Sequence, residues 1–489
     1  FFVLLRSDRG LFLINVIGFF LMPGLLFSIF RQLSIARKVA WTWMWIFPLA
    51  YGYVTQAGSI GNDSAGAVFL LASVFFGLRA RSSGKASDIW FAGLAAALMT
   101  GTKLSNLPLL LPCLIAVWPA LIKLRERLFV SCAVACVAIL ISAAPTMALN
   151  QIYTGSWTGD PNNSSGLRVQ SPTGAFFGNS LLLLQQSLMP PVLPGAHKIN
   201  DALNKKMPAS WQQILKEKFP RYYLGGLNEL PQEEAAGLGL GVTLLLLVSF
   251  FAAICGVGRR NGNSKIALKI SFVALAAWIS VLFYMFKMGS ESAPRLMLPY
   301  YPLAIVPFLL LRAQNCLLQF RVWKIFILLA ALSVLPAIIL SPSRPLFPAA
   351  HLSEQFAQSH PASAAAQRLF SVYSTYAHRN DSLAPLREHL PDGVEKIGFV
   401  AGTDDTDYSL WRPFGDRQVV YLQNEIKNSA AIPNDVEWIA VKRTTWHEFS
   451  DLPLEEWAAQ HHAQIVFSVP ITTVVAWGEE TWCLLQIQK

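Results

Sequence analysis

Long runs of apolar residues, separated by short polar turns, fill most of the chain up to residue 341. About 20 apolar residues cross the hydrocarbon core of a bilayer as a helix, and these runs approach that length. We expect about ten spans, one for each run, at residues 11–30, 41–58, 65–79, 88–102, 105–122, 128–148, 237–256, 266–287, 296–311 and 325–341. Residues 1–341 are therefore predicted to form an α-helical polytopic membrane domain.

The pattern changes after residue 342, where short strand-like runs replace the long ones. KIGFV, QVVYL, VEWIAV, QIVFSV and CLLQIQ are such runs, and two helical patches, SLAPLREHL and PLEEWAAQHH, lie among them. Strand-sized runs with helical patches between them favour a sheet packed against helices. We expect residues 342–489 to form an α/β domain.

Lys and Arg residues gather in alternate loops between the expected spans. The five loops that carry them hold Arg31, Arg37 and Lys38; Arg79, Arg81 and Lys85; Lys123, Arg125 and Arg127; Arg259, Arg260 and Lys265; and Arg312, Arg321 and Lys324. Loops rich in Lys and Arg stay on the cytoplasmic side of a membrane. The long loop 149–236 and the domain 342–489 are therefore predicted to be extracytoplasmic. Amphipathic pieces of that loop, such as ASWQQILKEKF, predict helices that lie over the outer mouth of the bundle.

Composition agrees with a membrane protein and argues against nucleic-acid binding. Hydrophobic residues make up 53% of the 489 positions and charged residues only 14%, which is too apolar for an ordinary soluble protein. Residues 1–341 hold 28 Lys and Arg against 11 Asp and Glu, whereas residues 342–489 hold 11 against 18. The basic residues form short clusters between apolar runs rather than one binding surface, so we expect no nucleic-acid partner.

Three charged residues lie on the predicted outer side, next to apolar runs where an unpaired charge is costly. They are Asp63, Lys103 and Arg295. A carboxylate can accept a proton or hold a hydroxyl, and two cations can neutralise a departing phosphate. Simpler roles are also open: Asp63 fits a helix N-cap, Lys103 a side chain that reaches from a helix end to the interface, and Arg295 a headgroup anchor.

The acidic loop GTDDTDYSLWRPFG follows the first expected strand of the second domain. Asp404, Asp405 and Asp407 are spaced so that they could hold a divalent ion, but the spacing matches no specific calcium loop. A solvated acidic loop is the alternative. We find no phosphate-binding glycine loop and no HExxH zinc motif in the sequence.

Three stretches together resemble the membrane glycosyltransferases of the GT-C fold. They are IGNDSAGAVFLLASVFFGLRAR, FAGLAAALMTGTKLSNLPLLLP and APRLMLPYYPLAIVPFLL. The nearest similarity is to the bacterial group related to protein O-mannosyltransferases and the aminoarabinose transferase of lipid A, and it covers about residues 1–341. The resemblance implies a GT-C-like helical bundle in the cytoplasmic (inner) membrane that uses a polyprenyl-phosphate sugar at the outer face.

The resemblance also implies roles for the three charged residues. Asp63 matches the family's second acidic position, Lys103 the Lys that ends a GLxxxTK-like stretch, and Arg295 the basic residue before an LPxxP-like helix. The family's first acidic residue, usually taken as the catalytic base, lies in the first outer loop. We expect that loop upstream of Phe1, where the sequence opens without an initiator Met. Asp8 does not match the motif.

The predicted function is transfer of a sugar from a polyprenyl-phosphate-linked donor to a lipid, glycan or protein acceptor. Asp63 would have the catalytic role, and Lys103 and Arg295 would bind the donor phosphate. We expect no tightly bound cofactor and no metal ligands, and a requirement for a divalent ion stays open. The alternatives are a transporter or flippase of a lipid-linked sugar, with the same charges along its pathway, and a membrane scaffold whose outer domain binds a partner.

Overall fold

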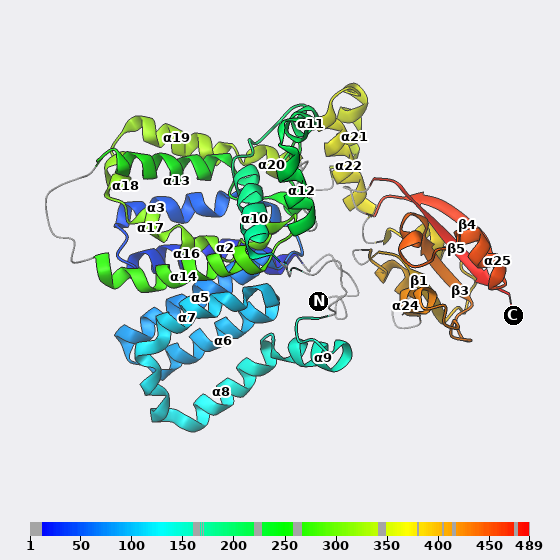
Figure 1. Ribbon diagram of the computed structural model, residues 1–489, viewed down its shortest axis with the longest axis horizontal. Helices are drawn as coiled ribbons and strands as arrows, with labels where there is room; N and C mark the ends of the chain where they lie inside the picture. Colours follow the sequence, from blue (N-terminus) through cyan, green and yellow to red (C-terminus); the bar gives the residue numbers. More distant parts are fainter. Residues whose placement is uncertain are drawn as a thin grey trace. The chain divides into compact units, whose positions relative to one another are not determined.

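The computed structural model describes residues 12–159, 167, 169, 171–219, 227–257, 267–340, 349–378, 381–402, 405–412, 417–473 and 478–488. The described chain divides into a helical unit within residues 12–343 and a smaller unit, containing a sheet, within residues 344–489 (Figure 1). Each unit has its own hydrophobic core.

The first half of the helical unit consists of helices joined by short turns. Its helices are α2 (Leu13–Gln32), α3 (Arg37–Ile46), α4 (Tyr51–Ala57), α5 (Asp63–Ser83), α6 (Ala86–Thr102), α7 (Leu110–Val117), α8 (Leu128–Ile141) and α9 (Ala144–Thr154). The 3₁₀ segments η1 (Phe47–Leu49), η2 (Leu104–Leu109) and η3 (Trp118–Arg127) connect some of them.

The second half begins with the long loop that the sequence predicts to lie outside. Its elements are α10 (Pro172–Ser187), α11 (Ala196–Lys206), α12 (Ala209–Lys218), η4 (Glu233–Ala235), α13 (Gly239–Ile254), α14 (Ala267–Lys287), α15 (Ala293–Leu296), α16 (Tyr301–Ala304), α17 (Val306–Leu309), α18 (Arg312–Leu317), α19 (Arg321–Leu332) and α20 (Leu335–Leu340). The prediction that helices form in this loop is confirmed by α10, α11 and α12.

Five helical segments in the described part of the chain are long and apolar enough to cross a membrane. They are Leu13–Gln32, Asp63–Ser83, Leu104–Ile141, Glu233–Ile254 and Arg321–Leu340. Several expected spans are not continuous α-helices, among them residues 41–58 (α3, η1 and α4), 105–122 (η2, α7 and η3), 128–148 (α8 and α9) and 296–311 (short helices). Prolines explain the breaks within 41–58 and 296–311, because Pro48, Pro302 and Pro307 begin new helical segments and supply no backbone N–H. The count of ten spans stays a prediction.

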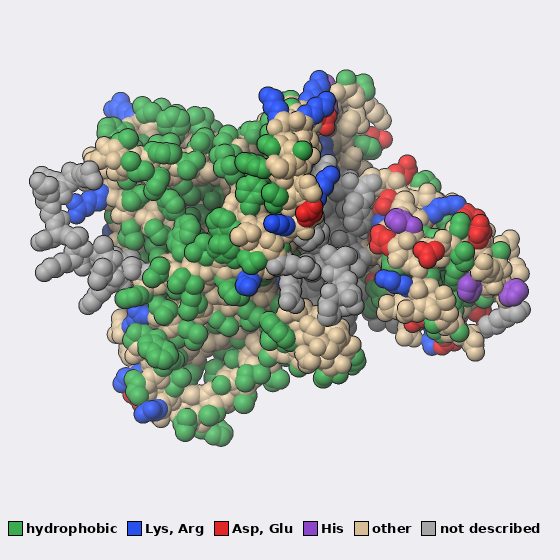
Figure 2. Space-filling view, in the orientation of Figure 1, with side chains coloured by type: hydrophobic (Ala, Val, Ile, Leu, Met, Phe, Trp, Pro, Cys, Tyr) green, Lys and Arg blue, Asp and Glu red, His purple; other side chains and the backbone are tan. Residues whose placement is uncertain are grey.

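The outer surface of the helical unit is apolar. Figure 2 shows hydrophobic side chains spread over the face that α13, α14 and α19 form in Figure 1. Helix α8 has no buried residue, and α19 buries only Trp323. Soluble proteins rarely expose apolar patches of this extent, so this surface requires an apolar surrounding.

Helix α5 lies at the centre of the unit, packed against α2, α6 and α7. Small residues let the neighbouring helices approach closely, as is common in membrane helix packing. A Cβ atom on Gly77 would lie 3.1 Å from the Cβ of Ala116 in α7. A Cβ atom on Gly101 in α6 would lie 2.3 Å from the carbonyl oxygen of Ile141, at the end of α8.

The unit within residues 344–489 is built on a five-stranded sheet of order β2-β1-β3-β5-β4. Its strands are β1 (Lys396–Val400), β2 (Gln418–Tyr421), β3 (Trp438–Lys442), β4 (Ala463–Ile471) and β5 (Glu480–Ile487). β1 pairs in parallel with β2 and β3, while β5 pairs antiparallel with β3 and β4. The five predicted strands are thus confirmed, each within a few residues of its expected position.

Short helices complete this second unit, and its buried residues form two hydrophobic clusters. The helices are α21 (Ala350–Ser359), α22 (Ala364–His378), α23 (Ala384–Arg387), α24 (Gln423–Lys427) and α25 (Leu454–Gln460), with 3₁₀ segments η7 (Tyr408–Trp411) and η8 (Arg443–Glu448). The pairing of β4 with β5 is irregular between Ile465 and Phe467, where a bulge interrupts the register. β4 lies at one edge of the sheet and contains Pro470.

Candidate functional site

Asp63 is the first residue of α5, and it is only 1% exposed. A carboxylate in the first turn of a helix is favoured by the partial positive charge of the unpaired N–H groups there. The residue before it, Asn62, makes no side-chain capping bond to the helix. The side chain of Asp63 is engaged by residues outside α5.

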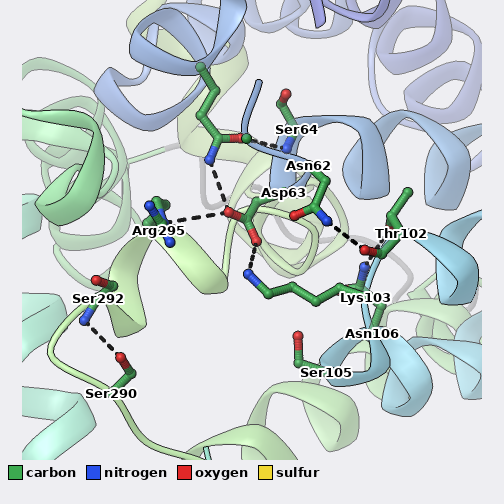
Figure 3. A network of polar contacts seen from close by, with 12 residues as sticks. Asn62, Asp63, Ser64, Thr102, Lys103, Ser105, Asn106, Ser290, Ser292 and Arg295 are labelled. Atoms are coloured by element: carbon green, nitrogen blue, oxygen red, sulfur yellow. Dashed lines mark hydrogen bonds and ion pairs between the residues drawn. The ribbon is translucent and has the colours of Figure 1, made fainter. Parts of the chain in front are cut away.

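Two of those residues are the cations singled out in the sequence. Lys103 Nζ lies 2.9 Å from Asp63 Oδ1, and Arg295 Nε lies 3.6 Å from Asp63 Oδ2. Figure 3 shows the two side chains reaching the two carboxylate oxygens from different sides. The first distance is a charge-assisted hydrogen bond, while the second is an ion-pair separation. The three predicted residues thus form one cluster, although they are far apart in sequence.

Lys103 is positioned by the abrupt end of α6. The helix stops at Thr102, and the backbone of Lys103 is extended, with φ −165° and ψ 134°. Asn62 Nδ2 donates to the Thr102 carbonyl at 2.6 Å, and Asn106 Nδ2 donates to Thr102 Oγ1 at 3.0 Å (Figure 3). These bonds hold the corner so that the lysine side chain runs back to the start of α5.

Gln56, from α4, is a site residue that the sequence reasoning missed. It is fully buried, and its Nε2 donates to Asp63 Oδ2 at 3.0 Å. Its Oε1 accepts the backbone N–H of Ser64 at 2.8 Å. Gln56 therefore accepts the Ser64 N–H, a bond that the side chain of a capping residue usually makes. The carboxylate of Asp63 remains available to the two cations.

Glu233 and Glu234, in η4, also reach the site and were not predicted. Arg295 Nη1 donates to Glu234 Oε2, and the Glu234 side chain is 67% exposed. Ser59 Oγ donates to Glu233 Oε1 at 2.5 Å. The only sequence signal was their position: adjacent acids at the end of the outer loop, directly before an apolar run.

The turn that precedes α5 is held from two sides. Asn15 of α2 is buried, and its Nδ2 donates to the carbonyl of Ser59 at 2.8 Å. Gly61 donates its N–H to Ser59 Oγ at 2.7 Å, and a Cβ atom at Gly61 would lie 2.5 Å from Glu233 Oε1. A side chain at this position would displace the Glu233 carboxylate. Asp63 is therefore presented by a fixed turn.

The charged groups of the cluster differ in their exposure to solvent. Asp63 is buried, and the side chains of Lys103 and Arg295 are 26% and 19% exposed. Asp63 faces both cations, and Glu233 and Glu234 add negative charge near Arg295, with the Glu234 side chain 67% exposed. A cation pair with one exchangeable carboxylate partner is suited to receive an anionic group such as a phosphate.

Comparison with protein-family models, with curated proteins and with solved structures finds no match for this chain. The chemical interpretation of the site therefore depends on the residues and their geometry.

The acidic loop of the second unit does not gather its described carboxylates in one place. Asp405 is buried and accepts from Lys442 Nζ at 3.0 and 3.1 Å, while Asp407 Oδ2 accepts from Trp411 Nε1 and from Tyr421 OH, each at 2.9 Å. Asp404 lies outside the described residues. Among the described residues, no group of three His, Cys, Asp or Glu side chains is arranged to hold a metal ion.

Proposed function

We propose that the protein is a membrane glycosyltransferase, GT-C-like in its helical unit, that transfers a sugar from a polyprenyl-phosphate-linked donor to a lipid, glycan or protein acceptor. The observation that carries the proposal is the cluster of Asp63, Lys103 and Arg295 at the start of α5. The reaction takes place at the outer face of the cytoplasmic membrane, the side on which the alternation of basic loops predicts this end of the bundle to lie. The second unit is extracytoplasmic in the same orientation.

In the proposed reaction, an acceptor oxygen attacks the anomeric carbon of the sugar, and the bond from that carbon to the phosphate oxygen breaks. The electron pair of the broken bond stays on the phosphate, and the acceptor's proton passes to a carboxylate or to water. Negative charge therefore develops on the leaving phosphate, where Lys103 and Arg295 stabilise it. Such stabilisation accelerates the reaction because it is stronger in the transition state than in the bound donor.

Asp63 has an orienting role in this scheme. Both of its oxygens are engaged, one by Lys103 and the other by Gln56 and Arg295. It holds the two cations at fixed positions, so little reorganisation is needed when charge develops. Glu234 forms an ion pair with Arg295 in the structure. When the donor binds, its phosphate replaces Glu234 as the partner of Arg295.

The position of the charges supports a transferase over a transporter. A transporter or flippase would place its charged groups near the middle of the membrane. Here Asp63 is the first residue of α5, Lys103 directly follows α6, and Arg295 lies in the short α15. All three are at helix ends.

The test measures transfer from radiolabelled polyprenyl-phosphate sugars, with several sugars tried, in membranes of cells that express the full-length gene. We expect Arg295→Ala to abolish transfer and Arg295→Lys to retain part of it, because lysine keeps the charge without the planar group. Arg321→Ala removes an exposed arginine at the start of α19 and is expected to leave transfer unchanged. Full activity of Arg295→Ala, or no transfer from any donor by the unmodified protein, would contradict the proposal.

A further inference from the structure

A cavity of about 380 Å³ lies at the end of the helical unit opposite the Asp63 site. Leu33, Leu78, Arg81, Ile115, Trp118 and Phe272 line it, together with polar residues at the end of α2. Helix α5 connects the two places: Asp63 begins the helix and Arg81 lies in its last turn. At 1.5 Å per residue, the two positions are roughly 27 Å apart along the helix axis.

The cavity lining combines apolar and polar side chains. Trp118 and Phe272 form part of its wall and are themselves 69% and 62% exposed on the outer surface of the unit. Gln32, the last residue of α2, and Ser34, in the turn that follows, are its polar lining residues besides Arg81. An amphipathic ligand fits this arrangement, with its apolar part between the aromatic side chains and its polar part at the arginine.

Arg81 is held at the cavity wall by the end of α7. Its Nε donates to the carbonyl oxygen of Ala116 at 2.7 Å, and its Nη2 donates to the carbonyl of Ile115. These carbonyls belong to the last turn of a helix and lack partners within it. The guanidinium has five N–H groups, so further donors remain for a ligand.

Among the described residues, Arg81 forms no ion pair with a carboxylate. The ion pairs at this end of the bundle join Arg79 to Asp88 and Lys123 to Glu126. The nearby acid, Asp88, pairs with Arg79 at 3.5 Å and accepts from Ser83 Oγ. The loops at this end are those rich in Lys and Arg, which the sequence predicts to be cytoplasmic. Basic pockets between membrane helices on that side bind the headgroups of anionic lipids.

We propose that this cavity binds one anionic phospholipid. The lipid phosphate accepts hydrogen bonds from Arg81, the glycerol region fills the cavity, and the acyl chains leave it along Trp118 and Phe272. A volume of about 380 Å³ suits the glycerophosphate part of a lipid and excludes the chains. The apolar wall distinguishes this occupant from a free phosphate, which would leave most of the lining without a partner.

The test measures lipid retention by native mass spectrometry on the purified full-length chain, after titration with phosphatidylglycerol, phosphatidylcholine or glycerol phosphate. We expect one phosphatidylglycerol to bind at least tenfold more tightly than phosphatidylcholine, and glycerol phosphate not to be retained. Arg81→Gln should lower the affinity for phosphatidylglycerol at least tenfold. Lys85→Gln removes an exposed charge at the same end, outside the cavity lining, and should leave the affinity unchanged.

A second variant guards against loss of folding in Arg81→Gln, which also loses the bonds to α7. Gln32→Trp places a large side chain at the rim and leaves Arg81 in place, and it should also weaken phosphatidylglycerol binding tenfold. Equal binding of the two lipids, equal effects of Arg81→Gln and Lys85→Gln, or unchanged binding by Gln32→Trp would each overturn the proposal. Retention of glycerol phosphate as tightly as the lipid would do so too, by indicating a site for soluble phosphates. The readout is independent of sugar transfer.

Discussion

Gln56 binds Asp63 through a hydrogen bond in which Gln56 is the donor and Asp63 the acceptor. The Gln56 amide nitrogen donates to Asp63 Oδ2 at 3.0 Å, because its carbonyl end is already engaged by the N–H of Ser64 at 2.8 Å. The same side chain thus binds the carboxylate and satisfies the helix terminus behind it. Its loss would leave two buried polar groups without this partner.

Replacing Gln56 by methionine should therefore destabilise the protein by about 1–3 kcal/mol, the usual cost of unpaired buried polar groups. Proposed sugar transfer should fall as well, since Asp63 loses one of its restraints. Thermal unfolding in detergent and the transfer assay measure the two effects. Gln151→Met, at an exposed amide that bonds to the Gly155 carbonyl, is the matched control and should change neither. Equal behaviour of the two variants would contradict a special role for Gln56.

The charges at Asp63 and Lys103 can be tested as a pair. Asp63→Asn leaves two cations without their buried counter-ion, and removing one partner of a buried ion pair typically costs about 3–5 kcal/mol. Lys103→Met removes one of these cations, so the double variant should be clearly more stable than the sum of the single effects predicts. The double variant should still lack the proposed sugar transfer, because the proposed phosphate site loses a cation. Additive losses of stability, within about 0.5 kcal/mol, would mean that the two side chains do not interact.

Glycines in α6 should respond in opposite ways to a single added methyl group. Gly101→Ala would place its Cβ against the Ile141 carbonyl oxygen, a backbone atom, and should destabilise the protein by about 1–3 kcal/mol. Gly93→Ala has open space around it and should stabilise the helix by about 0.5–1 kcal/mol. Unfolding temperatures of the two variants, measured in the same detergent, decide the matter. A stabilised Gly101→Ala would show that α6 and α8 do not approach as described.

The second unit should lose stability in acid through Asp381. Burial raises the pKa of Asp381, but hydrogen bonds from Arg387 and Ser409 and the charges of Arg387 and Arg412 outweigh it, so its pKa lies below 3.8. A carboxyl whose pKa is lower in the folded state stabilises the fold above its unfolded pKa of about 3.9, and this stabilisation is lost as the pH falls through the folded value. Hydrogen exchange of peptides from residues 381–412, corrected for intrinsic rates, should show protection lost below about pH 4.

Asp381→Asn should remove this acid-sensitive contribution. The difference in hydrogen-exchange protection between the variant and the unmodified protein should therefore be largest near neutral pH and should shrink in acid. Asp451→Asn, at an exposed carboxyl, serves as the control and should follow the unmodified protein at every pH. If the difference caused by Asp381→Asn were the same at pH 7 and below pH 3, its stabilising effect would not be electrostatic.

Secondary structure was predictable wherever one residue pattern dominated a segment. The five strands of the second unit were found because each is a short run of β-branched or aromatic residues between turns. The segments at 41–58 and 296–311 were expected to be single spans because apolar content alone does not show where a helix breaks. Pro48, Pro302 and Pro307 were visible in the sequence, but a proline can either kink a membrane helix or begin a new one.

The candidate site was predictable only in part. The alternation of basic loops placed Asp63, Lys103 and Arg295 at one end of the bundle, and the structure adds that they touch. Gln56 gave no signal, because a neutral amide within an apolar run has no pattern that distinguishes a site residue from a packed one. Glu234 was missed because it comes from a loop whose path back to α15 depends on tertiary structure.

The edge strand β4 has a consequence for how the protein behaves at high concentration. A nine-residue edge strand offers unpaired N–H and C=O groups to which a strand of a second molecule could add. The bulge between Ile465 and Phe467 bends this edge, and Pro470 removes one donor from it. Both features make this edge of the sheet a poorer template for a strand from another copy of the protein.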